Sequence, residues 1–235
     1  LHNHSNWSDG AATIEEMALG AIARGRKVLA ITDHSGGLSV TGGLSVERLH
    51  QQRAEIQAVQ ARLGDQILLL QGAEVEIRAD GSLDYPDVVL AELDVVVASL
   101  HTSLRQPREQ VTARLLNAIQ NPHVDIIGHP SGRLLGYREG ADLDWEQVLP
   151  AARESRVALE INANPSRLDL DEIYARRAAE MGIPIAIDTD SHAPDQFDLA
   201  EYGVSVARRA WLSADQVVTT WPPGKICEFL KRKRA

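Results

Sequence analysis

The sequence predicts an α/β fold built on a parallel sheet. Short runs rich in β-branched residues alternate with stretches of helical periodicity, which is typical of sheets whose successive strands are connected by helices. Most of these runs are apolar at every position, as strands buried on both faces are. Counting a short strand at Leu1 to His4, the β-α pattern repeats about seven times, and this favours a closed barrel over an open sheet.

Each element is expected where its periodicity is clearest. The other strands are expected at Val28 to Thr32, Ile67 to Ile77, Asp94 to Leu100, Val124 to Gly128, Val157 to Asn162 and Ile183 to Asp188. The helices are expected at Ile14 to Arg24, Val46 to Leu63, Arg108 to Gln120, Trp145 to Glu154 and Asp171 to Met181. No flexible linker, charge block or repeat divides the chain, so residues 1–235 are expected to form one domain. The basic tail, Lys231 to Arg234, is expected to be solvated.

The composition excludes several classes of protein. Acidic residues outnumber basic ones, 33 against 24, and the net charge of −9 is opposite in sign to that of a freestanding basic DNA-binding protein. Aromatic residues make up 4% of the chain, too few for a single-stranded nucleic-acid platform built on stacking. The single cysteine, Cys227, excludes an intramolecular disulfide or a thiolate metal cluster, and we expect a cytoplasmic protein. No apolar run is long enough for a membrane span.

The histidines are placed as metal ligands would be. His2 and His4 stand two residues apart in a predicted strand, so both imidazoles point to the same face. In a barrel of parallel strands, the residues that follow the strands share one rim, where the chemistry takes place. Six of the eight histidines lie at the start of the chain or just after a predicted strand: His2, His4, His34, His101, His129 and His192.

Three carboxylates are expected at the same rim: Asp9, Glu74 and Asp190. Nine candidate ligands are too many for one tetrahedral site, but they suffice for two or three ions if a carboxylate bridges. Imidazole and carboxylate donors without thiolate suit Zn, Mn or Fe and do not distinguish among them. The two remaining histidines, His50 and His123, lie in or beside helical patterns and are expected at the surface.

Two further acidic residues lie beside the expected ligands or at the end of a predicted strand. Asp33 directly precedes His34, and it either orients an imidazole from behind or has no part in the site. Asp188 is expected to face the barrel side or the start of a helix.

These motifs together resemble the PHP (polymerase and histidinol phosphatase) family over nearly the whole chain. The resemblance rests on Leu1-His2-Asn3-His4-Ser5, Ser8-Asp9-Gly10, Ile31-Thr32-Asp33-His34-Ser35, Gly72-Ala73-Glu74, Ser99-Leu100-His101, Gly128-His129-Pro130 and Thr189-Asp190-Ser191-His192. It implies a distorted seven-stranded (β/α) barrel, similar to a TIM barrel, with up to three metal ions at the C-terminal rim of its strands.

The resemblance also implies how the ligands divide among three sites. One set would be His2, His4, Glu74 and Asp190. A second would share Glu74 as the bridge and add His101 and His129. The third would be Asp9, His34 and His192, and many family members have a histidine where Asp9 stands. The carboxylate is a harder ligand, which would favour Mn or weaken occupancy of the third site.

The segments between the ligands resemble one branch of the family, the C-terminal PHP domain of bacterial family X DNA polymerases. They are Thr41 to Leu49, Asp80 to Asp87, Gly132 to Gly136, Glu160 to Pro165 and Tyr202 to Trp211. In those enzymes a polymerase module comes first, and an aspartate stands just before the position of Leu1. Both are missing here, so we expect a fragment of a longer polymerase chain.

This resemblance implies a Mn-dependent 3′→5′ exonuclease acting in DNA repair, with 3′-phosphatase or 3′-phosphodiesterase activity as further options. Metal ions that share a ligand hydrolyse phosphate esters with metal-activated hydroxide, and no residue here resembles a protein nucleophile. DNA 3′ ends would be the substrate, aided by a fused polymerase module. Arg133 and Arg167 are candidate phosphate clamps, because guanidinium binds phosphate through two parallel hydrogen bonds. Two surface arginines on loops are the alternative.

Two other functions remain open. A small-molecule phosphatase of the histidinol-phosphatase type would share the metal motifs, although the intervening segments disfavour it. A non-catalytic PHP scaffold would be expected to lose ligands, whereas all nine positions are filled here.

Overall fold

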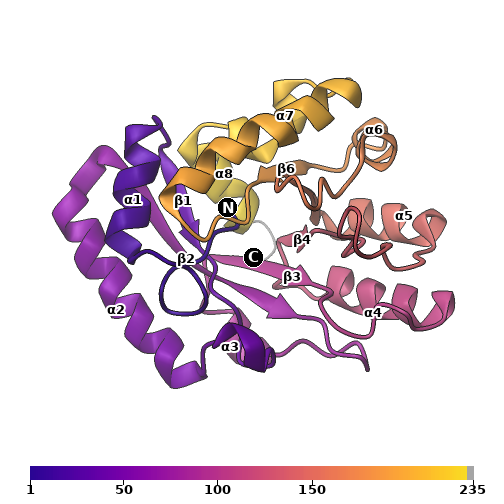
Figure 1. Cartoon of the computed structure of the whole chain (residues 1–235), viewed down its shortest axis with the longest axis horizontal. Coiled ribbons are helices and arrows are strands. Elements are labelled where there is room, and N and C mark those ends of the chain that lie inside the picture. Colours follow the sequence, from indigo (N-terminus) through magenta and orange to yellow (C-terminus); the bar gives the residue numbers. More distant parts are fainter. Residues whose placement is uncertain (232–235) are drawn as a thin grey trace.

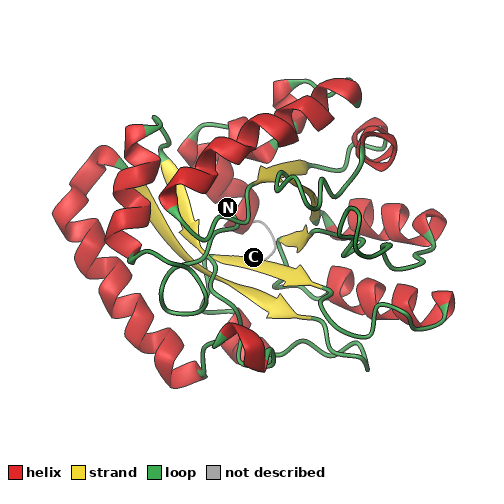
Figure 2. Ribbon diagram, viewed as in Figure 1, coloured by secondary structure: helices red, strands yellow, loops and turns green. Residues whose placement is uncertain are grey.

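The computed structural model describes residues 1–231, whose strands form one parallel six-stranded sheet (Figure 2). The strands are β1 (Val28–Ile31), β2 (Leu68–Glu76), β3 (Val95–Ser99), β4 (Ile126–Gly128), β5 (Ala158–Asn162) and β6 (Ile185–Asp188). They lie in the sheet in sequence order, and each pairs with the next in parallel. Nearly every strand residue is buried, which confirms the prediction from the continuous apolar runs.

The helices surround the strands, with α1 and α2 on one side and α4 and α5 on the other (Figure 1). They are α1 (Ile14–Ala23), α2 (Val46–Leu63), α3 (Asp87–Leu90), α4 (Arg108–Gln120), α5 (Trp145–Ser155), α6 (Glu172–Glu180), α7 (Ala200–Arg209) and α8 (Pro223–Lys231). The five predicted helices are confirmed. The short α3 and the last two helices were not predicted. Most of the predicted basic tail, residues 232–234, lies outside the described residues.

Side-chain caps fix where several helices begin. The Thr13 hydroxyl accepts a hydrogen bond from the Glu16 amide, and the Glu16 carboxylate accepts one from the Thr13 amide, forming a capping box at α1. Ser45 caps α2, and Asp171 caps α6 by accepting from two backbone amides. By contrast, α7 has no side-chain cap, which is one reason that its start is hard to see in the sequence.

The predicted seventh strand at residues 1–4 is not confirmed. Asn3 forms a single isolated parallel bridge with Ser191, and the His4 amide donates to the Ser191 carbonyl at 2.8 Å. On the other side, the Thr32 amide donates to the Asn3 carbonyl at 2.8 Å. The segment therefore lies between the ends of β1 and β6, but one bridge is too short to make a strand.

The core has an outer part and an inner part. The inner part covers one end of the sheet and leaves the other end uncovered. Large apolar clusters fill the space between the sheet and the surrounding helices. A separate cluster on the inner face of the strands joins Ala30, Val97 and Ile126 to Ile226 and Phe229 of α8. It includes the first residues of β1 and β2, so α8 covers the amino ends of the strands. The carboxyl ends are left for polar side chains.

Within residues 1–231, no helix has the length and apolarity that crossing a bilayer requires. Cys227 lies half-buried in α8 as a free thiol.

Candidate metal centre

The side chains predicted as metal ligands gather at the carboxyl ends of the strands. The segment before α1 supplies three of them, and Glu74 lies in β2. The others follow β1, β3, β4 and β6. Three groups have donor atoms within 4.8 Å of one another: His4, Asp9, His34 and His192; His2, His4, Glu74 and Asp190; and His34, Glu74 and His101. His129 joins the cluster through Glu74, with its Nε2 atom 2.8 Å from Oε1.

Glu74 lies at the centre of the cluster. Its Oε1 atom lies 2.8 Å from His129 Nε2 and 3.2 Å from His101 Nε2. Its Oε2 atom lies 3.0 Å from His34 Nδ1 and 3.3 Å from His2 Nε2. Burial by itself would raise the pKa of the Glu74 carboxyl, but the surrounding imidazoles hold that pKa well below its usual range. His4 Nε2 lies 3.5 Å from the same Oε2 atom. Oε1 therefore faces two imidazoles and Oε2 faces three, as the oxygens of a carboxylate that bridges two cations would.

The group around His2 and Asp190 matches the first ligand set that the resemblance implies. His4 Nε2 lies 2.9 Å from Asp190 Oδ1, and His2 Nε2 lies 3.6 Å from the same oxygen. His2 Nε2 and Glu74 Oε2 are buried 3.3 Å apart, yet neither has a hydrogen-bond partner within residues 1–231. Buried polar atoms are normally paired. Donor atoms that converge without bonding to one another fit a shared divalent cation.

The group around Asp9 is more open to solvent. The Asp9 carboxylate is 31% exposed, and its oxygens lie 3.5 Å from His34 Nε2 and 3.4 Å from His192 Nε2. Burial alone would lower the pKa of His192, but Asp9 and Asp190 raise it to about 9. The residues implied for the third site thus lie together. His4 joins them, because its Nδ1 atom lies 3.8 Å from Asp9 Oδ1.

Two carboxylates that sequence reasoning missed hold the imidazoles from behind. Glu160 Oε1 lies 2.7 Å from His2 Nδ1, and its other oxygen accepts a hydrogen bond from the His129 amide. Glu76 Oε2 lies 2.7 Å from His101 Nδ1 and accepts from the His101 amide. Such contacts fix the tautomer and the orientation of a metal-binding histidine. A signal existed for Glu76, which follows Glu74 by two residues and so shares its side of the strand.

Asp33 does not orient an imidazole. Its carboxylate accepts from the Ser5 amide at 2.8 Å, the Ser5 hydroxyl at 2.6 Å and the Gln52 side chain at 2.6 Å. The Ser8 hydroxyl also donates to it. These donors belong to residues 5–8, the loop that leads to Asp9, and to Gln52 of α2, and none of them is an imidazole. Asp33 therefore orders the loop rather than a ligand.

The two arginines predicted to bind phosphate have different surroundings. The Arg167 Nε atom lies 3.6 Å from Asp190 Oδ2, and its buried Nη1 atom has no hydrogen-bond partner within residues 1–231. Arg133 donates to the carbonyls of Arg167 and Leu168, and it lies 3.6 Å from Asp171. Arg167 thus faces the cluster, while Arg133 supports the loop that carries Arg167.

The two histidines that the sequence predicts at the surface, His50 and His123, belong to none of the three groups of donor atoms. His50 is exposed and lies 3.0 Å from Glu92. His123 belongs to the segment between α4 and β4.

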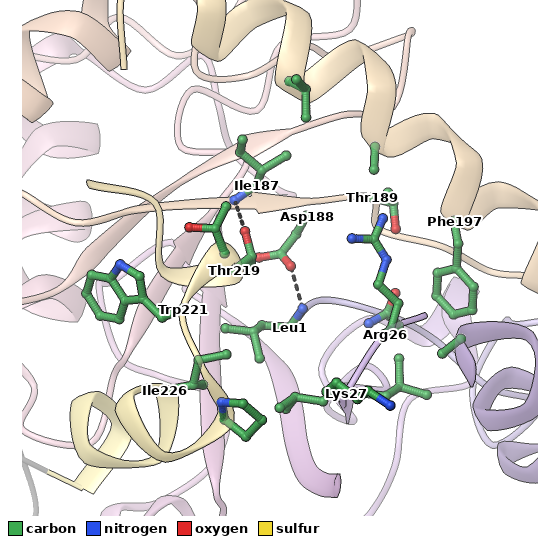
Figure 3. A pocket seen from close by; sticks show the side chains of 18 residues that line it. Leu1, Arg26, Lys27, Ile187, Asp188, Thr189, Phe197, Thr219, Trp221 and Ile226 are labelled. Carbon is green, nitrogen blue, oxygen red and sulfur yellow. Dashed lines mark hydrogen bonds and ion pairs between the residues drawn. The ribbon is translucent and has the colours of Figure 1, made fainter. Parts of the chain in front are cut away.

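A cavity of about 200 Å³ has none of the predicted ligands in its lining. Figure 3 shows the side chains that line it. Phe197, Trp221 and Ile226 contribute to its apolar wall. Asp188 lines it and accepts a hydrogen bond from the Leu1 amino group, and the Ile187 amide donates to Thr219 Oγ1 at 3.2 Å. Asp188 therefore faces this cavity.

Comparisons with known proteins agree with the fold and the motifs. Residues 1–164 match the PHP domain family. The chain is 46% identical over 232 residues to the DNA polymerase/3′-5′ exonuclease PolX of Bacillus subtilis (strain 168), covering 99% of this chain and 40% of that protein. It is 33% identical to a protein named "Probable phosphatase Teth514_1060" from Thermoanaerobacter sp. (strain X514), covering 99% and 94%. The chain thus spans less than half of the first relative and nearly all of the second.

Solved structures with low sequence identity share the α/β fold. A histidinol phosphate phosphatase from Lactococcus lactis, solved with zinc, L-histidinol and phosphate, has a TM-score of 0.63 at 18% identity and covers 90% of this chain and 93% of its own. A structure from Listeria monocytogenes has a TM-score of 0.65 at 15% identity, covering 83% and 95%. With a family match over residues 1–164 and the Thermoanaerobacter relative matched over most of its length, the chain belongs to the PHP domain family.

Proposed function

We propose that this chain is a metal-dependent phosphoesterase that trims DNA 3′ ends as a 3′→5′ exonuclease within a family X DNA polymerase. The observation that carries the proposal is the position of Glu74, each of whose oxygens faces at least two imidazoles. The Bacillus subtilis relative, named as a polymerase and 3′-5′ exonuclease, supports DNA as the substrate. Related 3′-phosphatase and 3′-phosphodiesterase reactions would use the same groups. Repair of DNA in the cytoplasm of a bacterial cell is the setting we infer.

The donor set fits two or three divalent ions, with Mn and Zn as the first choices and Fe also compatible. The first group would hold one ion with His2, His4, Glu74 and Asp190. Glu74 would share the second with His101 and His129, and Asp9, His34 and His192 would hold the third. When bound, such ions lower the pKa of a water and neutralise charge on the phosphoryl oxygens.

The residues of the chain hold the reacting groups in place. Hydrolysis breaks the bond between phosphorus and the 3′ oxygen, the water oxygen goes to phosphorus, and a proton goes to the departing 3′ oxygen. Arg167 lies beside Asp190 with a free nitrogen and would bind the anionic phosphate. Arg133 would act with it while keeping the Arg167 loop in position. Glu160 and Glu76 would orient His2 and His101.

A small-molecule phosphatase is the second candidate, because the Thermoanaerobacter relative named as a phosphatase matches the chain over 94% of its own length. A non-catalytic scaffold is disfavoured, since all nine predicted ligands lie in one cluster.

The decisive experiment compares two substrates with the same purified chain. Nucleotide release from a 3′-recessed duplex and phosphate release from histidinol phosphate would be measured with Mn²⁺, Zn²⁺ or Fe²⁺. We expect release of 5′-nucleotides from the duplex. Rapid hydrolysis of histidinol phosphate with an intact duplex would favour the second candidate, and no hydrolysis of either substrate by metal-loaded protein would favour a scaffold.

The net charge of the chain predicts that it binds DNA weakly without a further module. At −9, the protein must hold a polyanion against its own field, so we expect a high KM for DNA. A fused polymerase module would lower KM by positioning the terminus. Sub-micromolar binding of duplex DNA by the isolated chain, with a steep salt dependence, would contradict this expectation.

A further inference from the structure

Two loops meet beside the metal cluster and are joined by hydrogen bonds. The first, residues 131–139, follows His129 at the end of β4, and the second, residues 164–168, follows β5. The Leu135 amide donates to the Ser166 carbonyl at 2.7 Å, and Arg133 Nε donates to the Arg167 carbonyl at 2.8 Å. We call these two loops the arginine ridge.

The arginine ridge gathers arginines on an acidic protein. Its residues include three arginines and one acid, Glu139, whereas the whole chain carries −9. Arg138 lies close to the start of the first loop, because its Nε and Nη2 atoms both donate to the carbonyl of Gly132, the residue before Arg133. Outside the ridge, Asp171 and Asp190 each lie 3.6 Å from one of its arginines, Arg133 and Arg167. The buried Asp169 carboxylate accepts hydrogen bonds from Ser131 and Gly132 of the ridge. A gathering of cations next to a phosphoesterase centre suits a substrate with more than one phosphate.

The ridge also presents an aromatic ring to solvent. Tyr137 is 94% exposed at the tip of the first loop. The turn beneath it is well ordered by hydrogen bonds, because the Tyr137 and Arg138 amides both donate to the Leu134 carbonyl at 2.9 and 2.8 Å. The Arg138 guanidinium donates to the Gly132 carbonyl at 2.7 Å. The chain therefore holds a large aromatic side chain outward on a hydrogen-bonded turn.

We propose that the arginine ridge binds the single-stranded 3′ end of DNA. Arg133, Arg138 and Arg167 contact its phosphates, and Tyr137 stacks on one of its bases. The inference rests on the proposed function and adds which strand is held and where. A positively charged track with a stacking side chain is how proteins bind single strands without reading their sequence. The low aromatic content of the chain excludes an extended stacking platform, but it leaves room for one ring.

The test of stacking uses the full chain and a 3′-overhang oligonucleotide with 2-aminopurine at successive positions near its 3′ end. Stacking on Tyr137 quenches the base fluorescence. We expect Tyr137→Ala to abolish the quenching and to raise KM for the overhang about 5- to 100-fold, with the effect on KM rather than on kcat. Tyr137→Phe keeps the ring and should restore both readouts, whereas Tyr137→Leu should behave as the alanine variant does.

Tyr202, half exposed on α7, supplies the matched control. Tyr202→Ala should leave quenching and KM at the wild-type values. Equal quenching in wild type and Tyr137→Ala, or rescue by Tyr137→Leu, would overturn the assignment of the ring.

A salt series tests the phosphate contacts. Three contacts with a single strand give a slope of about −2 in the logarithm of affinity against the logarithm of salt. Arg138→Gln should make that slope shallower by about 0.7. An unchanged slope would remove Arg138 from the ridge's contacts. If wild type binds and quenches the overhang but releases no nucleotide, the proposed exonuclease fails while the ridge stands. If it releases nucleotides but the base fluorescence is not quenched, the proposal for the arginine ridge is wrong while the proposed exonuclease stands.

Discussion

His2 Nδ1 and Glu160 Oε1 lie 2.7 Å apart, both fully buried, and this contact joins the first residues of the chain to the middle of β5. The same carboxylate accepts the His129 amide, so one side chain orients two residues of the metal cluster. Asn162 adds a contact of 3.2 Å to Glu160 and another of 3.2 Å to Asp190. Glu160 is thus a positioning residue for two of the proposed ligands.

Replacing Glu160 tests that role. Glu160→Gln removes the negative charge behind His2 while keeping the size of the side chain. We expect the apparent metal affinity to fall about 10- to 100-fold, the usual cost of losing a partner behind a ligand. Metal titration followed by a spectroscopic probe measures the loss. Glu154→Gln, an exposed change on α5, is the matched control and should bind metal normally. Normal affinity in Glu160→Gln would show that the contact is dispensable.

Glu74→Ala tests the bridging carboxylate. Because both Glu74 oxygens face imidazoles, we expect the variant to lose more than one ion per chain and to lose hydrolysis entirely. Elemental analysis and a hydrolysis assay measure the two effects. His50→Ala removes a histidine that contacts Glu92 on the surface and should change neither. A Glu74→Ala protein with full metal content would exclude bridging, and a strong loss in His50→Ala would invalidate the ligand assignment.

Asp9→His tests the composition of the more exposed group. Imidazole is the softer ligand and suits zinc, so we expect an active variant whose preference moves from Mn toward Zn. The measurement is the ratio of hydrolysis rates in the two metals for both proteins. A folded but inactive variant would argue against Asp9 as a ligand.

Asp169 predicts a pH dependence that involves no proposed ligand. Burial raises the pKa of its carboxyl to about 6, against hydrogen bonds from the Ser131 amide and hydroxyl. In the unfolded chain, the pKa of an aspartate carboxyl is about 3.9. At pH values between about 3.9 and 6, the folded state therefore binds more protons than the unfolded state does. The contribution of Asp169 to the free energy of unfolding therefore falls as pH rises from about 4 to 6.

Asp169→Asn should remove this dependence. When the pH is raised from 5 to 7.5, the free energy of unfolding of the wild type should fall by about 1 kcal/mol more than that of the variant. Denaturant unfolding of both proteins at the two pH values gives the double difference, which cancels the other titrating groups. A double difference of zero, or of opposite sign, would mean that the pKa of Asp169 is not raised.

The positions of most elements follow from local pattern. Strands such as β3 are apolar at every residue because both faces are buried, and α2 and α4 begin and end where their periodicity does. The last two helices, α7 and α8, have no such local pattern in the sequence. Pro222, Pro223 and Gly224 at the start of α8 suggest a turn, and the helix is stabilised by apolar contacts with the inner face of the sheet.

The sequence by itself determined that the histidines after the predicted strands would gather at one end of the sheet, because a polar side chain just after a buried parallel strand must lie at its carboxyl end. Only the tertiary structure decided how they pair. His2 meets Glu160 across 158 residues, and Asp33, next to a proposed ligand, turns to the Ser5 loop instead. Residues 1–4 form one bridge rather than a strand for the same reason. Alternation along a strand sets the side to which a residue points, but its partner there depends on packing between distant segments, which no local pattern records.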